Sequence, residues 1–159
     1  MAGTAEEFVV TELTGESGHL DQVASWLHEE WGREDGYRLD ETRQWCAEVT
    51  ASRTEAVFAA LIGDALAGTA LLVDCDLDLE RYLCPWLSGF YIAPEFRGRG
   101  VGAHLLRAVE AAAREQAYER LYLYCRAGRL IANYESYGWQ MIKRFDLHGK
   151  RYSLMSKPL

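Results

Sequence analysis

The stretch FYIAPEFRGRGVGAHLL, residues 90–106, decides which kind of fold the chain adopts. An apolar run ends at Pro94, three glycines then alternate with arginines and a valine, and an alanine-rich helical pattern follows. A helix begins with backbone N–H groups that have no partner inside the helix, and its dipole favours an anion at that end. Glycines let a phosphate approach these amides closely, and arginines add positive charge and donors. The stretch therefore predicts a strand, a turn suited to a pyrophosphate, and a helix.

Two other phosphate-binding motifs compete for this stretch. A P-loop needs a lysine followed by Ser or Thr after its glycines, but Ala103 and His104 stand there, so this motif is excluded. The dinucleotide fingerprint GxGxxA is matched over residues 98–103. However, residues 94–97 separate the strand from the first glycine, and Arg126 stands where an acid is expected after the next strand. An arginine suits a phosphorylated dinucleotide, so an NADP-binding oxidoreductase remains an alternative.

The sequence RGRGVG at 97–102 resembles the R/Q-x-x-G-x-G/A motif of the GNAT N-acetyltransferases. The resemblance extends in both directions along the chain. LSGFYIAPEFRGRGVG (87–102) is similar to the fourth strand and pyrophosphate loop of that family. LYLYC (121–125), followed by NYESYGW (133–139), is similar to its fifth strand and to the helix that carries its tyrosine. This resemblance implies an acetyl-CoA-dependent N-acetyltransferase.

The periodicity of apolar residues predicts an order of elements that fits the same family. That order is strand, two helices, three strands, helix, strand, helix, two strands. The expected elements are a strand in 7–14, helices in 18–31 and 39–52, two strands in 56–74, a strand at 86–93, a helix over 100–116, a strand at 120–125, a helix in 129–139 and two strands in 140–157. Asp40 is predicted as the N-cap of the second helix, and Gly63-Asp64 and His148-Gly149 as turns. The expected fold class is α/β (an α+β mixed sheet). The length predicts one domain over residues 1–159, and the resemblance implies that it is a single acetyltransferase domain.

The resemblance implies how acetyl-CoA is bound. The backbone of Tyr91, Ile92 and Ala93 would pair with the pantetheine arm, where the fourth strand splays from its neighbour. Backbone amides at the start of the helix would hold the pyrophosphate, and Arg97 and Arg99 would screen its charge, although Arg99 is equally expected to face solvent. The residues that contribute these amides are Gly98, Arg99, Gly100, Val101, Gly102 and Ala103.

Tyr134 matches the family tyrosine near the CoA sulfur. Aminolysis of a thioester expels a thiolate, to which a phenol can donate a proton, so Tyr134 is the predicted catalytic residue, with Tyr137 in its place if the helix register differs. The amine would attack directly in a ternary complex, with the N–H of Ile92 polarising the acetyl carbonyl. An acetyl-enzyme on Cys125 is conceivable, but a packed thiol is the preferred interpretation of this cysteine.

The sequence departs from the family pattern in two places. Many members carry an asparagine seven residues before the tyrosine, where Ala127 stands here; Asn133 is beside the tyrosine instead. Many members also carry a carboxylate early in the fourth strand as general base, but residues 86–88 are Trp, Leu and Ser. The amine must still lose a proton. The base is therefore a loop acid, a water chain or bulk water, and the loop acids are Asp74, Asp76 and Asp78. The missing acid also leaves open a non-catalytic acetyl-CoA-binding regulatory module.

The acceptor side is expected from the first two helices and the loop before the fourth strand. Both segments combine acids with aromatic residues, namely Glu29, Glu30, Glu34, Asp35, Asp74, Asp76, Asp78 and Glu80 with Trp26, Trp31, Trp45, Tyr82 and Trp86. Acids and aromatic faces favour a cation. The predicted acceptor is a primary amine of a small cationic molecule or a peptide N-terminus.

Composition and charge exclude several other classes. The net charge is −7, with 19 acids and 5 bases in residues 1–96 against 5 acids and 12 bases in residues 97–159. The sequence pI is near 5.1 and no basic stripe is present, so nucleic acid is not an expected partner. No apolar run reaches membrane-spanning length, and the acidic residues near the start do not fit a signal peptide, so a cytoplasmic location is expected.

The cysteines and histidines do not indicate a metal site. The four cysteines lie far apart without a CxxC pair, which predicts reduced thiols and no bound metal. Homodimers are common among the proteins that the chain resembles, and the closing hairpin at 140–157 is the expected place for such a contact.

Overall fold

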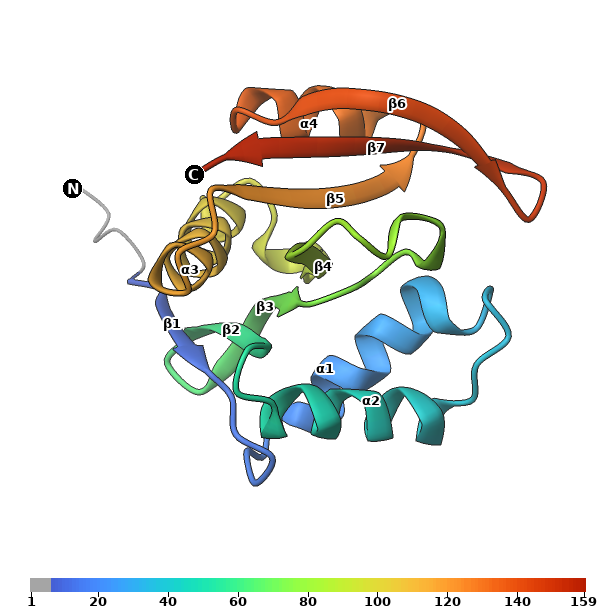
Figure 1. The fold of residues 1–159 in the computed structure, drawn as a ribbon. Coiled ribbons are helices and arrows are strands. Elements are labelled where there is room, and N and C mark those ends of the chain that lie inside the picture. The colour runs from blue at the N-terminus through green and yellow to red at the C-terminus, as the bar shows by residue number, and fades with distance from the viewer. Residues whose placement is uncertain (1–6) are drawn as a thin grey trace.

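The computed structural model describes residues 7–159, which form a seven-stranded sheet with the strand order β1-β2-β3-β4-β5-β7-β6. The predicted order of helices and strands is confirmed (Figure 1). The elements are β1 (Val9–Glu12), α1 (Leu20–Leu27), α2 (Leu39–Ala51), β2 (Ala56–Ile62), β3 (Ala65–Val73), β4 (Trp86–Ile92), α3 (Val101–Glu115), β5 (Arg120–Arg126), α4 (Arg129–Ser136), β6 (Gln140–Leu147) and β7 (Lys150–Pro158). In the part of the chain that is described, no helix has the length and apolar character needed to cross a membrane.

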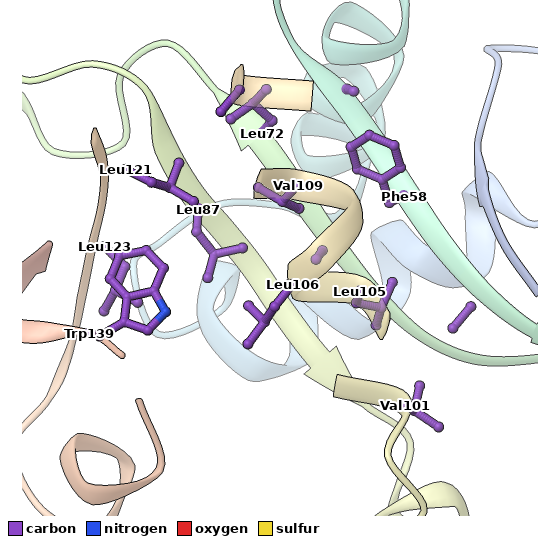
Figure 2. Packing of buried hydrophobic residues seen from close by; sticks show 14 of the residues in the cluster. Phe58, Leu72, Leu87, Val101, Leu105, Leu106, Val109, Leu121, Leu123 and Trp139 are labelled. Atoms are coloured by element: carbon purple, nitrogen blue, oxygen red, sulfur yellow. The ribbon is translucent and has the colours of Figure 1, made fainter. Parts of the chain in front are cut away.

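One face of the sheet is covered by α3 and α4 (Figure 1). The apolar side of α3, with Leu105, Leu106 and Val109, packs against side chains of the central strands, including Leu72 and Leu87 (Figure 2). These five residues are at most 3% exposed. The helix therefore forms where its 3.6-residue period matches the apolar face of the strands.

The opposite face is covered by α1 and α2, which lie together on one side of the sheet (Figure 1). Val23 and Leu27 of α1 pack with Leu71 of β3 and Trp86 of β4 in a second apolar cluster. Neighbouring residues of a strand point to opposite faces, so the two apolar clusters share the same strands.

The central feature of the sheet is the short contact between β4 and β5. All other neighbouring strands pair in antiparallel fashion over several residues, whereas β4 and β5 are parallel and pair only at Trp86 and Tyr122. The Tyr122 N–H also donates to the Pro85 carbonyl at 3.1 Å. Beyond this point the strands separate, as the family resemblance implies. A dinucleotide-binding fold needs a largely parallel sheet, so the oxidoreductase alternative is wrong.

A bulge at Gly89 shapes β4 before this opening. The register with β3 shifts between Thr69 and Leu71, and Gly89 has φ +58°. A Cβ on Gly89 would lie 2.9 Å from Leu71 Cδ1 and 3.0 Å from Leu27 Cδ2. The extra residue turns the following part of the strand, which is the usual effect of a bulge next to a functional site.

The start of the second helix differs from the prediction. Arg38, with extended backbone angles, is its N-cap, and Asp40 lies in the first turn. Asp40 Oδ1 accepts bonds from Arg38 Nε and the Glu41 N–H, each at 3.0 Å. A carboxylate is favourable anywhere in the first turn, so its presence did not fix the boundary residue. The first helix is also shorter than the expected range 18–31. Its α-helical part ends at Leu27, and a π-helical turn, His28–Gly32, follows it.

Replacing Gly89 with alanine should test how tightly the bulge is packed. We expect Gly89→Ala to lower the free energy of unfolding by about 2–4 kcal/mol, because left-handed strain and overlap with two leucines add. Gly63, in the β2–β3 turn, also has φ +58° but nothing within 4 Å of an added Cβ. Gly63→Ala should therefore cost only about 1–2 kcal/mol. Urea denaturation measures both values, and equal losses would contradict the packing role of Gly89.

Candidate active site

The glycine-arginine turn connects β4 to α3 through a 3-10 turn, Pro94–Phe96. Gly98 and Gly100 have φ of +76° and +85°, which favour glycine, and a Cβ at either position would meet nothing within 4 Å. The first turn of α3 carries no acidic residue that would neutralise the helix dipole. The space in front of the first amides of α3 is therefore open to an anion, and the donor set fits a pyrophosphate.

The two arginines of the turn lie differently. Arg97 Nε donates to the Ile92 carbonyl at 3.0 Å, and its guanidinium lies over the Tyr91 ring at 5.7 Å from the centroid. The Arg99 guanidinium lies over the Phe96 ring at 5.7 Å. Arg97 is thus held at the end of β4, and both arginines are exposed.

Three residues at the end of β4 are predicted to bind the pantetheine arm through their backbone, and one of them directs its backbone groups into the opening between β4 and β5. The Ala93 N–H donates to the Ala67 carbonyl of β3 at 2.9 Å. Antiparallel strands alternate between bonded and non-bonded pairs, so Ile92, opposite Gly68, directs its N–H and carbonyl away from β3 and toward β5. By the same alternation, Tyr91 and Ala93 direct their backbone groups to β3. Of the three residues predicted to contact the pantetheine arm, Ile92 is the one whose backbone groups face the opening.

Tyr134 lies on the α3/α4 face of β4. Its ring contacts Phe90 of β4 at a centroid distance of 6.1 Å and Trp139 at 6.1 Å in an edge-on arrangement. Burial, with a smaller contribution from Cys125 of β5, raises the pKa of the Tyr134 hydroxyl well above its usual range. The phenol therefore stays protonated at all working pH values and can act as a donor.

Tyr137, the alternative to Tyr134, lies elsewhere. Its side chain is 37% exposed, and its hydroxyl lies 3.7 Å from the position of a Cβ on Gly102, in the first turn of α3. The same Cβ would lie 3.0 Å from Phe90 Cζ, so Gly102 allows helix and strand to approach. Of the two tyrosines, Tyr134 is the one that packs against the core beside the strand opening.

The remaining predictions around α4 concern Asn133 and Cys125. Asn133 is exposed, and its carbonyl accepts a bond from Ser136 Oγ, so its side chain is not held in the opening. Burial raises the pKa of the Cys125 thiol to about 11, which keeps it protonated. Since the thiolate is the nucleophile, this agrees with a packed thiol.

The loop between β3 and β4 brings one carboxylate to the other face of β4. Ser88 Oγ donates to Asp76 Oδ1 at 2.9 Å. Burial raises the pKa of the Asp76 carboxyl to about 6; the bond from Ser88 opposes this, and the charge of Asp35 adds to it. Burial also raises the pKa of Tyr124 on β5, and Asp76 and Asp35 contribute to that rise. Asp76, Asp35 and Tyr124 therefore share one partly buried environment.

The other acids predicted for the acceptor side have other partners. Asp74 Oδ2 accepts from Oγ1 of Thr54, a residue that precedes β2, at 2.9 Å. Glu34 forms ion pairs with Arg126 and Lys150, and Glu80 forms one with Lys143. Asp78 lies exposed in a 3-10 turn.

The aromatic residues predicted for the acceptor side also lie in different environments. Trp86 is fully buried in the core, and Tyr82 is 94% exposed, so neither can line an acceptor site directly. Trp26 packs on Tyr91 at a centroid distance of 5.1 Å. Sequence reasoning missed Tyr124, although the alternation in RLYLYC (120–125) places it on the opposite face from Cys125.

No group of three or more His, Cys, Asp or Glu side chains among residues 7–159 is arranged to hold a metal ion. The site combines a helix-start anion site, an opening between two parallel strands, a protonated phenol on one face and a carboxylate on the other. Such a site suits transfer of an acyl group from a pyrophosphate-containing thioester.

The chain is similar in fold to solved structures of acetyltransferases. A ribosomal-protein-alanine N-acetyltransferase from Brucella melitensis is 21% identical with a TM-score of 0.76, over 95% of this chain and 99% of that one. An aminoglycoside 6'-N-acetyltransferase complexed with coenzyme A is 15% identical with a TM-score of 0.75, over 94% and 96%. A GNAT family acetyltransferase from Elizabethkingia anophelis with acetyl-CoA bound is 13% identical with a TM-score of 0.66, over 96% and 98%. At these identities the likeness concerns the fold. No curated protein matches the sequence.

The fold and the site define an acetyltransferase with acetyl-CoA as its acetyl donor. The family model for the acetyltransferase (GNAT) family matches residues 20–139, and the chain belongs to this family. The resemblance noted in the sequence, the fold class and the expected donor are confirmed.

The environment of Asp76 predicts a pH-dependent cost in stability. Its pKa is raised from 3.8 to about 6 on folding, so the folded state binds the proton more tightly and loses stability as the pH rises from about 4 to 6. Asp76→Asn removes this cost. Its gain in free energy of unfolding over the wild type should grow across that window to about 1–2 kcal/mol and stay constant above it.

Denaturation of both proteins at pH 4.5 and pH 7.5 measures this difference. Asp78→Asn, in the same loop, is the matched control and should show no such growth. A gain for Asp76→Asn that is the same at both pH values would contradict the raised pKa.

Proposed function

We propose that the chain transfers the acetyl group from acetyl-CoA to a primary amine of a small cationic molecule or a peptide N-terminus, directly and in a ternary complex. The observation that carries this proposal is the β4–β5 opening, which has the α3 amides at its end and a half-buried, protonated phenol beside it. Residues 1–159 act as a single acetyltransferase domain. The aminoglycoside and ribosomal-protein-alanine acetyltransferases of similar fold support an amine acceptor.

The helix-start amides of residues 98–103 would hold the pyrophosphate, with Arg97 and Arg99 at its sides. The bound thioester supplies an activated acetyl carbon. The Ile92 N–H, directed toward β5, would donate to the carbonyl oxygen as negative charge develops on it. Tyr134 would donate its proton to the departing sulfur.

The acidic residues around the other face of β4 support a cationic acceptor. Asp35 and Asp76 influence the same buried tyrosine, so negative charge is concentrated there. Rings of Tyr124, Phe145 and Tyr152 contact one another at 5.6–6.1 Å beside these acids. Carboxylates and aromatic faces together attract an ammonium group.

The setting proposed for the enzyme is the cytoplasm, which agrees with four free cysteines. The proposed site of a homodimer is the β6–β7 hairpin, where β6 lies at the edge of the sheet and exposes Met141 and Ile142.

Stabilisation by added ligands should distinguish an acetyltransferase from an NADP-binding oxidoreductase. We expect acetyl-CoA and CoA at 100 times their dissociation constants to stabilise the protein by about 2.7 kcal/mol, and NADPH to give no shift. Differential scanning fluorimetry measures this. Arg53→Ala, remote from the turn in the loop before β2, should respond as the wild type does, whereas Arg97→Ala should need more ligand for the same shift. Stabilisation by NADPH alone would overturn the proposal.

Turnover of amines tests whether the chain is an enzyme or a binding module. Thiol release from acetyl-CoA should occur with at least one of kanamycin, spermidine and a short peptide that begins with alanine. Stabilisation by acetyl-CoA with no release on any of these amines would favour a regulatory module.

The role of Tyr134 is tested by removing its hydroxyl. Tyr134→Phe should lower kcat by about 10²-fold, because general acid catalysis contributes about 10²–10⁴-fold, while the thermal shift with CoA is kept. Tyr82→Phe, at a side chain that is 94% exposed, is the control and should keep kcat within twofold. Unchanged turnover in Tyr134→Phe would show that the leaving thiolate takes its proton from elsewhere.

A further inference from the structure

We propose that Asp76, oriented by Ser88, is the general base that removes the proton from the acceptor amine. This inference rests on the proposed N-acetyltransferase function and assigns its missing base. The start of β4 carries no carboxylate of its own, but Ser88 stands there and its hydroxyl binds the Asp76 carboxylate at 2.9 Å. The loop thus delivers to β4 the group that the strand lacks.

The position of Asp76 relative to the proposed acid supports this role. Ser88 binds Asp76 on the α1/α2 side of β4, whereas Phe90, two residues further on, contacts Tyr134 on the α3/α4 side. The base and the acid therefore lie on opposite faces of the strand that borders the opening. An amine arriving from the α1/α2 side would have its proton acceptor there, and the sulfur on the other side would have its proton donor.

The structure also separates Asp76 from the other two loop acids. The Asp74 carboxylate accepts a bond from Thr54, which precedes β2, and Asp78 is exposed in its 3-10 turn. Of the three, Asp76 is the one whose carboxylate accepts a hydrogen bond from a side chain of β4. Asp76 has no ion-pair partner among the described residues, so an ammonium group of the acceptor would be the first cation to pair with its carboxylate.

The surroundings of Asp76 strengthen it as a base. Burial raises the pKa of the carboxyl to about 6, so the group is ionised at neutral pH and yet binds a proton more tightly than an exposed aspartate does. Several titratable groups face this region from neighbouring elements. They are Asp35 and Tyr37 before α2, Tyr124 on β5 and Tyr152 on β7, with Glu34, His148 and Lys150 lining the adjacent 220 Å³ pocket.

The step balances without a further reactant. The ammonium group of the acceptor gives one proton to the Asp76 carboxylate and becomes a neutral amine. Its lone pair forms the C–N bond with the acetyl carbon, the C–S bond breaks, and its electron pair goes to the sulfur, which takes the proton of Tyr134. The nitrogen loses a second proton after the C–N bond has formed. Of the two protons that the nitrogen has lost, one restores the Tyr134 hydroxyl and the other is released to solvent.

Asp76→Asn tests the base directly. With the best acceptor of the panel at pH 7.5, the variant should lose about 10²-fold or more in kcat/KM while its thermal shift with acetyl-CoA is unchanged. In the wild type, kcat/KM should fall below about pH 6 as Asp76 is protonated. In Asp76→Asn this limb should disappear, and the rate should follow only the fraction of free amine.

A second acceptor distinguishes a base from a structural residue. An analogue whose ammonium pKa is about 7 needs little help to lose its proton at pH 7.5, so Asp76→Asn should be at least tenfold less impaired on it than on an amine of pKa about 10. Asp76→Glu should recover part of the activity, and Ser88→Ala should lower kcat by less than Asp76→Asn does. Asp78→Asn is the matched control and should keep the wild-type pH profile.

The outcomes separate this inference from the function on which it rests. If the wild type acetylates an amine and Asp76→Asn is equally active, or equally impaired on both analogues, Asp76 is not the base, but the acetyltransferase function stands. If the wild type acetylates none of the amines, the proposed function fails and the base fails with it. If Asp76→Asn loses its shift with acetyl-CoA, Asp76→Glu decides. A folded Asp76→Glu that keeps the shift with acetyl-CoA but has no activity overturns the role, and so does an active Asp76→Glu whose kcat/KM does not fall at acidic pH.

Discussion

The structure depends on the pairing between β4 and β5, which stops after Trp86 and Tyr122. Trp86 is fully buried and contacts the rings of Tyr122 and Tyr124, so the closed end of the opening is held by a packed aromatic core. Past this point the backbone groups of β4 that face β5 have no strand partner. Unpaired backbone groups are costly when buried, and a bound ligand that takes the place of the missing strand pairing removes that cost. The opening is therefore a place where backbone groups of β4 are available to form hydrogen bonds with a substrate.

The bulge at Gly89 and the turn at Gly98 and Gly100 use positive φ for different purposes. At Gly89 the added space is filled by leucines from α1 and β3, so glycine is needed for packing as well as for backbone angle. At Gly98 and Gly100 the space stays open, so glycine gives the backbone angle and leaves room for an anion. The first position shapes the strand, and the other two expose the helix start.

The sequence predicted the order of elements because each one carries its own periodicity or turn signal. The helix over 100–116 and the turn at His148-Gly149 needed only local information. The anion site could also be predicted, since helix-start amides, glycines and arginines are neighbours in sequence. The N-cap of α2 could not be fixed, because Asp40 is favourable both at the cap and in the first turn.

The contact between Asp76 and Ser88 could not be predicted from local sequence patterns. The two residues are 12 positions apart, and nothing in the loop distinguishes Asp76 from Asp74 or Asp78. Which of the three reaches β4 is decided by the path of the loop over the sheet and by the bulge, both of which are tertiary properties. Likewise, only the register with β3 shows that Ile92, and not Tyr91 or Ala93, turns its backbone toward β5.

Burial acts on the two proposed catalytic groups in the same direction but with opposite consequences. It raises the pKa of both Tyr134 and Asp76, since in each case it disfavours the anion. For the phenol this costs nothing, because the neutral form is the one needed as a proton donor. For the carboxylate the ionised form is needed, so the protein loses stability as the pH rises from about 4 to 6, and in exchange it has a stronger base. A hydroxyl from Ser88 is a suitable partner in this situation, because it holds the carboxylate in place without supplying a full positive charge. An arginine or lysine at that position would stabilise the anion further, return its pKa to the ordinary range or below, and weaken it as a base.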